Sequence, residues 1–244
     1  MPGSWTWFLR LPATDVWRGL ERCLGRGWRG LVLAGAGMLA GWWVYVPLHE
    51  LLHAGACRAA GGAVSRLEID PAYGGAALAH VFPFVVSGGA YAGRLSGFDT
   101  RGSDWTYLAT DLGPFVLTLV PGVWALRRAA AARRPLLFGA ALPFALAPFL
   151  SLTGDAYEIG SILVTRLPPW SAPATRTLLR GDDLFAKLGQ LSSAPPPAPW
   201  GAAAAAILLG CLWAWTTYAA GAAVAHLAGA PAIYPEARRL QQAV

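Results

Sequence analysis

The sequence predicts an α-helical multi-pass membrane protein, with about four transmembrane helices and a short strand-containing insertion after the first of them. Composition is the first observation: 55% of the 244 residues are hydrophobic, and the mean hydropathy is +0.44. Charged residues make up 13% of the chain, whereas a typical soluble domain carries about 25%. Long apolar runs are the second observation, because about 20 such residues cross a bilayer. The three cysteines are scattered and form no disulfide framework.

Residues 1–30 form the first expected segment, which contains four tryptophans and five arginines. Its apolar pieces are too short for the hydrophobic region of a signal peptide. Aromatic and basic residues together are typical of an amphipathic helix in the membrane interface. The first spanning helix is expected to follow from about Leu31 to Ala59, and the Gly61-Gly62 pair favours its end there.

The strand-containing insertion is expected directly after this helix. Apolar and polar residues alternate from Val64 to Asp70, which predicts a short strand. The next apolar run, Ala76–Val86, is bounded by glycines and contains Pro83, so it is interpreted as either a strand or a re-entrant segment. His80 lies in this run and is expected to be an ordinary loop histidine, since no partner stands at the spacing of a metal site.

The predicted catalytic membrane core extends over residues 31–167 and includes two further spans. Trp105–Leu126 is the second span, and it is interrupted near Asp111 and Gly113-Pro114. Pro135–Gly154 is the third span, in which two internal prolines predict a kink or a break.

The C-terminal third of the chain is expected to hold a loop and the last span. Residues 168–200 are rich in proline and are interpreted as a loop with an extended linker. The final domain, residues 201–244, combines a fourth spanning helix from Gly201 to about Ala228 with a basic tail.

The net charge of +6 comes almost entirely from arginine. We interpret it as topological charge, because cytoplasmic loops of membrane proteins are enriched in Lys and Arg, and not as a nucleic-acid surface. With four spans, the N-terminal segment, the Arg127–Arg134 loop and the tail all lie on the cytoplasmic side. The abundance of Ala, Gly and Arg indicates a bacterial chain, and the inner membrane is then the expected location.

A metal-binding motif lies at the end of the first expected span, where His49, Glu50 and His53 follow the pattern H-E-x-x-H. Residues four apart lie on one helical face, so the two imidazoles can bind one ion. Zinc is the expected ion, and Glu50 beside it can act as the general base that takes a proton from water. Ionisable groups beside an apolar run are costly and therefore indicate function.

A catalytic zinc site needs a third protein ligand, and Asp155 is the leading candidate. His49 lies 18 residues after Leu31 and Asp155 lies 20 residues after Pro135. At about 1.5 Å per residue, both therefore reach a similar depth of roughly 27–30 Å from the same side. Glu158, one helical turn later, and Asp111, in the second span, remain the alternatives.

The motif helix resembles the active-site helix of the site-2 protease family of intramembrane zinc metalloproteases, because His49–Ala54 is followed by small residues that end in Gly61-Gly62. Gly113-Pro114 stands where that family has a Gly-Pro pair, although the family's asparagine is absent. Asp155 stands where the family has its third zinc ligand. The resemblance also implies that strands after the active-site helix pair with an extended substrate.

The function expected from motif and resemblance is intramembrane proteolysis, with a membrane-anchored protein as the substrate and the bilayer as the surroundings. Two alternatives remain. One is a membrane zinc peptidase that trims peptides at the membrane surface, and the other is a non-catalytic metal-binding protein that regulates a partner. Glu50 distinguishes them, because hydrolysis requires a base and a purely structural metal site does not.

Overall fold

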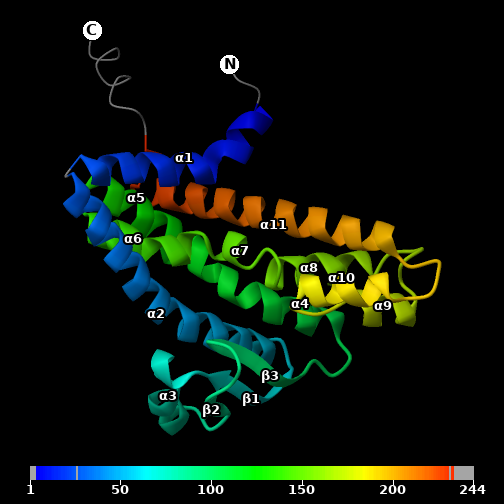
Figure 1. Cartoon of the computed structure of the whole chain (residues 1–244). Helices are drawn as coiled ribbons and strands as arrows, with labels where there is room; N and C mark the ends of the chain where they lie inside the picture. Colours follow the sequence, from blue (N-terminus) through cyan, green and yellow to red (C-terminus); the bar gives the residue numbers. More distant parts are fainter. Residues whose placement is uncertain (1–3, 26, 231, 234–244) are drawn as a thin grey trace. The chain divides into compact units, whose positions relative to one another are not determined.

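The computed structural model describes residues 4–25, 27–230 and 232–233, and most of them are helical (Figure 1). Three helical runs are long and apolar enough to cross a membrane: α2 (Trp28–Ala59), Asp104–Ala131 and α11 (Trp200–Leu227). These features are those of a helical membrane protein, with three such runs among the described residues where about four were expected. The first and last expected spans are confirmed as helices, and the basic tail lies largely outside the described residues.

The chain divides into two compact units. The first unit contains the chain up to Tyr45, the segment Leu117–Ala147 and the part from Trp215 onward. The second unit contains Val46–Val116 and Pro148–Ala214.

A buried ion pair joins helices of the first unit. The N-terminal segment forms α1 (Ser4–Leu24), and its Asp15 is 1% exposed. Arg127 of α5 (Val123–Ala131) donates to the Asp15 carboxylate at 2.8 Å, and the hydroxyl of Tyr218 donates to the same oxygen at 3.0 Å. The segment expected in the membrane interface therefore also contributes a carboxylate to the interior of this unit.

The break expected in the third span is confirmed. The span is divided into α6 (Pro135–Ala145) and the single turn α7 (Ala147–Leu150). Pro148 has no N–H to donate to the carbonyl of Phe144, four residues earlier, so the ladder breaks there. The Thr118 hydroxyl donates to that carbonyl at 2.9 Å instead. Neither piece has the length of a spanning helix.

The expected interruption of the second span is confirmed. Its first part is α4 (Asp104–Leu112), which ends in the 3₁₀ turn η2 (Gly113–Phe115). A larger break lies in η3 (Thr118–Gly122), where Val120 is extended at φ −150° and ψ 120°. Val120 precedes a proline, and the proline ring disfavours the helical conformation of the residue before it. The helix resumes as α5.

The second unit contains a sheet of three strands in the order β2-β1-β3. The expected strand is confirmed as β1 (Ala63–Ile69), which pairs in parallel with β2 (Val85–Ser87) and antiparallel with β3 (Gly93–Asp99). Leu67 and Ile69 of β1 are fully buried and pack with Ala54 of α2. The sheet is thereby held against the helix that carries the metal motif.

The strand alternative for Ala76–Val86 was wrong over most of the run. After the 3₁₀ turn η1 (Pro71–Tyr73), the run forms the short helix α3 (Gly75–Val81), and only its last two residues join β2. Three alanines and a leucine begin the run, at positions 76–79, and favour a helix there. This helix supplies the crossover that parallel strands require.

The Glu68 carboxylate of β1 accepts one hydrogen bond from its own strand and one from Ser96 of β3. The Arg66 guanidinium donates to Glu68 Oε1 at 2.8 Å, and the Ser96 hydroxyl donates to the same oxygen at 3.1 Å. These hydrogen bonds lower the pKa of the Glu68 carboxyl below its usual value, the one from Arg66 contributing most.

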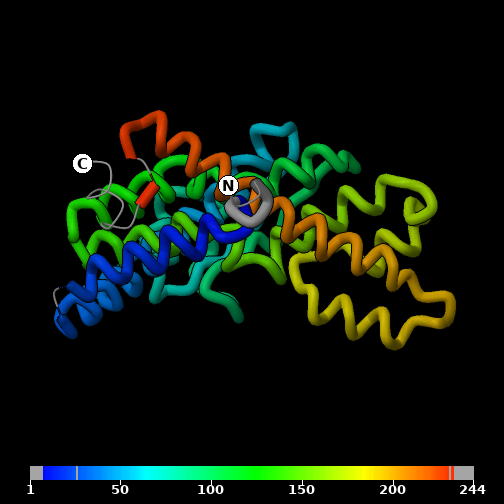
Figure 2. The backbone as a smooth tube through the Cα atoms, turned by 90° about the horizontal axis from the view of Figure 1, so that it is seen from above, coloured from blue at the N-terminus to red at the C-terminus, as the bar shows by residue number. Residues whose placement is uncertain are grey.

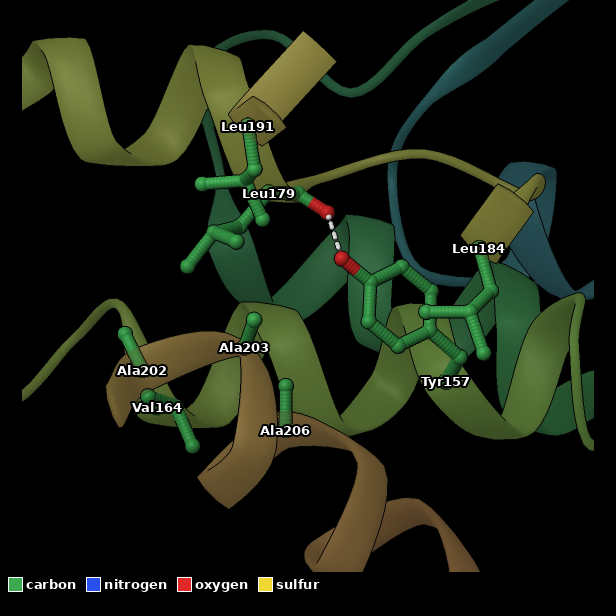
Figure 3. Packing of buried hydrophobic residues seen from close by; sticks show 8 residues of the cluster. All are labelled: Tyr157, Val164, Leu179, Leu184, Leu191, Ala202, Ala203 and Ala206. Carbon is green, nitrogen blue, oxygen red and sulfur yellow. Dashed lines mark hydrogen bonds between the residues drawn. The ribbon is translucent and has the colours of Figure 1, made fainter. Parts of the chain in front are cut away.

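The Pro-rich segment 168–200, expected as a loop, contains two helices. They are α9 (Pro173–Leu179) and α10 (Leu184–Ser192), which lie beside the first part of α11 (Figure 2). Their leucines form a buried cluster with Tyr157 of α8 (Asp155–Val164) and with alanines of α11 (Figure 3). The Tyr157 hydroxyl donates to the Leu179 carbonyl at 2.8 Å. The burial of leucines at helical spacing therefore stabilises two helices in this segment, and its prolines lie mainly outside them.

Small residues allow α8 and α11 to approach closely in the second unit. A Cβ at Gly160 would lie 2.0 Å from the Ala206 carbonyl oxygen, and one at Gly210 would lie 2.4 Å from the Ala156 carbonyl oxygen. Each helix therefore presents two small residues four positions apart, as close helix pairs in membranes commonly do.

We expect Gly160→Ala to destabilise the protein by about 1–3 kcal/mol, since the new methyl group would collide with backbone. Gly55→Ala is the matched control, because it changes the same residue type in a helix but meets no atom within 4 Å. Alanine should stabilise that helix by up to about 1 kcal/mol. Thermal unfolding in detergent should therefore move the two midpoints in opposite directions. Equal midpoints would contradict the close approach.

Candidate metal centre

Two elements of the second unit bring the candidate metal ligands together. His49 and His53 lie one turn apart on α2, and Asp155 is the first residue of α8. The two histidine Nε2 atoms are 3.1 Å apart. Asp155 Oδ2 lies 3.2 Å from His49 Nε2, and Oδ1 lies 3.4 Å from His53 Nε2. These side chains are 9–12% exposed, so the cluster is nearly closed to solvent.

The separations fit one shared metal ion. Ligand atoms about 2.1 Å from a tetrahedral zinc lie about 3.4 Å from one another, and the three observed distances are close to this value. Asp155 Oδ2 is buried and accepts no hydrogen bond from any described residue. The group His49, His53 and Asp155 could therefore hold a metal ion. Two imidazoles and a carboxylate suit zinc and also other divalent transition metals.

A backbone carbonyl of α4 orients His53. The Nδ1 atom of His53 lies 2.8 Å from the carbonyl oxygen of Thr110. A carbonyl can only accept, so Nδ1 carries the proton of a neutral imidazole, and Nε2 presents its lone pair to the cluster. Metal-binding histidines are commonly fixed in this way by a hydrogen bond to their second nitrogen.

Gly113 allows the carbonyl of Thr110 to reach that position. A Cβ at Gly113 would lie 2.6 Å from the Leu52 carbonyl oxygen and 2.7 Å from Ala56 Cβ, both on α2. The end of α4 therefore contacts the backbone of the motif helix at this glycine. The Gly-Pro pair singled out in the sequence thus serves close packing beside the cluster.

The Glu50 side chain lies between the metal ligands and the strand β3. Glu50 lines the same cavity as His53 and Asp155, and its carboxylate accepts a hydrogen bond from the backbone N–H of Leu95. A Cβ at Gly93 would lie 2.5 Å from Glu50 Cγ, so only glycine leaves room for the carboxylate in this position. Glu50 is beside the ligand group and is not one of its members.

The cavity next to the cluster measures about 330 Å³. Glu158 and Asp111, the two alternatives for the third ligand, line this cavity but lie outside the described group that could share an ion. The hydroxyl of Tyr107 hydrogen-bonds Glu158. One oxygen of Asp111, Oδ2, is buried and has no hydrogen-bond partner among the described residues. The geometry therefore places Asp155, and neither alternative, with the histidines.

Two other residues considered from the sequence lie away from the cluster. His80 is exposed in the last turn of α3 and does not belong to the ligand group. Cys57 is fully buried, and its Sγ lies 3.8 Å from the Ala63 carbonyl oxygen, so it packs under the start of β1.

Sequence reasoning missed the contributions of Thr110, Gly93 and Leu95. Thr110 and Leu95 act through backbone atoms, which any residue except proline at Leu95 could supply, so their identities carry no signal. The alternation of Arg94, Leu95 and Ser96 could have predicted a further strand. Gly93 could then have been noted as a glycine in a strand, which often marks a close approach.

Comparison of the chain with protein-family models, with curated proteins and with solved structures gives no match.

We expect the purified protein to bind about one zinc ion per chain, and Asp155→Ala to weaken that binding more than Glu158→Gln or Asp111→Asn. Loss of one of three ligands should exceed the roughly 10–100-fold effect of losing an outer partner. Chelator competition measures the three affinities side by side. Equal zinc content in wild type and in a His49→Ala, His53→Ala variant would refute a site at this cluster. If Glu158→Gln strips the ion and Asp155→Ala does not, the two carboxylates exchange roles.

Proposed function

We propose that the chain is an intramembrane zinc metalloprotease, similar to the site-2 protease family, which hydrolyses a peptide bond in or near a transmembrane segment of a membrane-anchored protein. The observation that carries the proposal is the position of Glu50. Its carboxylate is held by β3 beside a buried group of two histidines and an aspartate. A metal site with no catalytic role would not need the Glu50 carboxylate beside its ligands. Apolar helices long enough to cross a membrane support a substrate within the bilayer.

The proposed chemistry divides between the ligands and Glu50. His49, His53 and Asp155 would hold zinc, which when bound acts as a Lewis acid toward water and the scissile carbonyl. Glu50 would accept a proton from the attacking water at a carboxylate oxygen and later deliver it to the departing amine nitrogen. The Leu95 N–H keeps the carboxylate turned toward the cavity.

The strand β3 is the proposed support for the substrate. It is an edge strand of the sheet and contributes Gly93, Leu95 and Ser96 to the cavity wall beside Glu50. An edge strand offers unpaired N–H and C=O groups to an extended peptide. Proteolysis requires such an extended chain, because the amide bonds of a helix are shielded. We place this reaction in a bacterial inner membrane with the N-terminal segment and the Arg127–Arg134 loop on the cytoplasmic side, as the arginine distribution indicates.

We expect Glu50→Gln to abolish proteolysis while zinc content stays near that of the wild type. The amide is nearly isosteric with the carboxylate, but it cannot accept the proton that hydrolysis releases from water. A fall of at least about 100-fold in rate is expected, in line with the 10²–10⁴-fold contribution of a general base. The assay is cleavage of a panel of single-span proteins, tagged at both ends and reconstituted with the enzyme in vesicles.

Other outcomes of this assay favour the alternatives. Cleavage of soluble peptides alone would indicate trimming at the membrane surface. Tight zinc binding with no cleavage of any substrate by the wild type would favour a regulatory metal-binding protein. Unchanged turnover in Glu50→Gln would remove Glu50 from the mechanism.

Gly93→Ala is expected to reduce cleavage while leaving zinc affinity unchanged. The added methyl group must displace the Glu50 side chain, because its Cβ would lie 2.5 Å from Glu50 Cγ. Misplacement of a catalytic group by about 1 Å can cost roughly 100-fold. Gly55→Ala, which meets open space on the motif helix, is the control and should cleave at the wild-type rate. Full activity of Gly93→Ala would show that this contact does not position the base.

A further inference from the structure

A second cavity lies entirely within the first unit, between the antiparallel helices α5 and α6. Its volume is about 710 Å³, which is within the usual range for small-molecule sites. Alanines and larger apolar side chains form most of its wall. The lining includes Trp124, Ala125, Arg128, Arg134, Leu137 and Phe144.

Positive charge is concentrated at one end of this groove. Arg128 lies in the last turn of α5, and Arg134 immediately precedes α6, so both stand at the connection between the helices. Both are exposed, no acidic residue lines the groove, and neither guanidinium forms an ion pair with a described residue. The C-terminal end of α5 and the N-terminal end of α6 meet at this connection, so their partial charges offset each other and the two arginines supply the net charge. The combination attracts an anion.

The rest of the groove is apolar over the length of one membrane leaflet. From Arg134 to Phe144 the chain advances ten residues, which is about 15 Å along a helix. This is half of the roughly 30 Å hydrocarbon thickness of a bilayer. Trp124 lies one turn before Arg128, and tryptophan is enriched at the level of the lipid headgroups.

We propose that this groove binds one anionic diacyl phospholipid. The headgroup phosphate would pair with Arg128 and Arg134, and an acyl chain would lie along Leu137 toward Phe144. Arginine suits phosphate because its planar guanidinium donates two parallel hydrogen bonds. A transmembrane helix of a protein partner fits less well, since it is about 10 Å wide and needs contacts over about 30 Å. The inference does not depend on the proposed protease activity.

The test is native mass spectrometry of the full-length protein in detergent, titrated with phosphatidylglycerol and separately with phosphatidylcholine. The wild type should retain one phosphatidylglycerol and bind phosphatidylcholine at least tenfold more weakly. Arg128→Gln with Arg134→Gln should weaken phosphatidylglycerol binding about 25-fold, from about fivefold for each arginine near a membrane surface. The matched control, Arg29→Gln with Arg101→Gln, removes the same charge outside the groove and should stay within about twofold.

A second variant separates a lipid site from a simple phosphate site. Ala125→Phe fills the groove and leaves both arginines, so it should also lose phosphatidylglycerol, while glycerol phosphate should not compete in any variant. The proposal is overturned if the two arginine pairs lose binding equally, if glycerol phosphate competes as well as the lipid, or if phosphatidylcholine binds equally. It is also overturned if the wild type retains a copurified helical peptide in the groove and no lipid.

Discussion

The hydrogen bond between the His53 ring and the Thr110 carbonyl is the interaction on which the candidate centre depends. It links two helices of the second unit and fixes which imidazole nitrogen carries the proton. The bond forms only because α4 ends against the backbone of α2 at Gly113, where any side chain would collide with Leu52. The absence of a side chain at Gly113 thus positions the carbonyl of Thr110, three residues earlier in α4, and this carbonyl orients the candidate ligand His53 on α2. Asp155 then needs only to stand at the start of α8, which packs against α4.

The surroundings of the cluster hold more carboxylates than a single metal ion requires. Glu50, Asp155, Glu158 and Asp111 all line one cavity, although burying a carboxylate without a partner is costly. Each carboxylate has a different environment. Glu50 accepts from a strand N–H, Asp155 lies beside two histidines, and Glu158 accepts from a tyrosine hydroxyl. One oxygen of Asp111 has no hydrogen-bond partner among the described residues. A bound cation would reduce the repulsion among them. A bound metal ion would therefore stabilise the acidic lining of the cavity, and the acidic lining would in turn favour binding of the ion.

An element could be predicted when residues close together in the sequence specify it, and could not be predicted when contacts between distant residues do. The helices α2 and α11 were predicted because continuous apolar runs specify them, and the two histidines because four-residue spacing is a local property of a helix. The break in the third span was predicted from its prolines, whereas the Thr118 hydroxyl that satisfies the freed carbonyl is a contact that no local pattern reveals. The leucines of α9 and α10 pack against other helices, a contact that the sequence does not show. The Pro-rich composition of this segment therefore led to the wrong prediction of a loop. Asp155 was placed by an argument about membrane depth, whereas the backbone groups of Thr110 and Leu95 leave no trace in residue identity.

The buried pair of Asp15 and Arg127 constrains the order in which the chain can be assembled. The two residues are 112 positions apart, so α1 leaves the ribosome long before the cation that neutralises its carboxylate has been made. Until then Asp15 must remain in water or lose its charge, because an unpaired carboxylate in an apolar interior is unfavourable. Tyr218, which donates to the same oxygen, is synthesised later still. The helix α1 is therefore translated first but is among the last elements of this unit to reach its final packing.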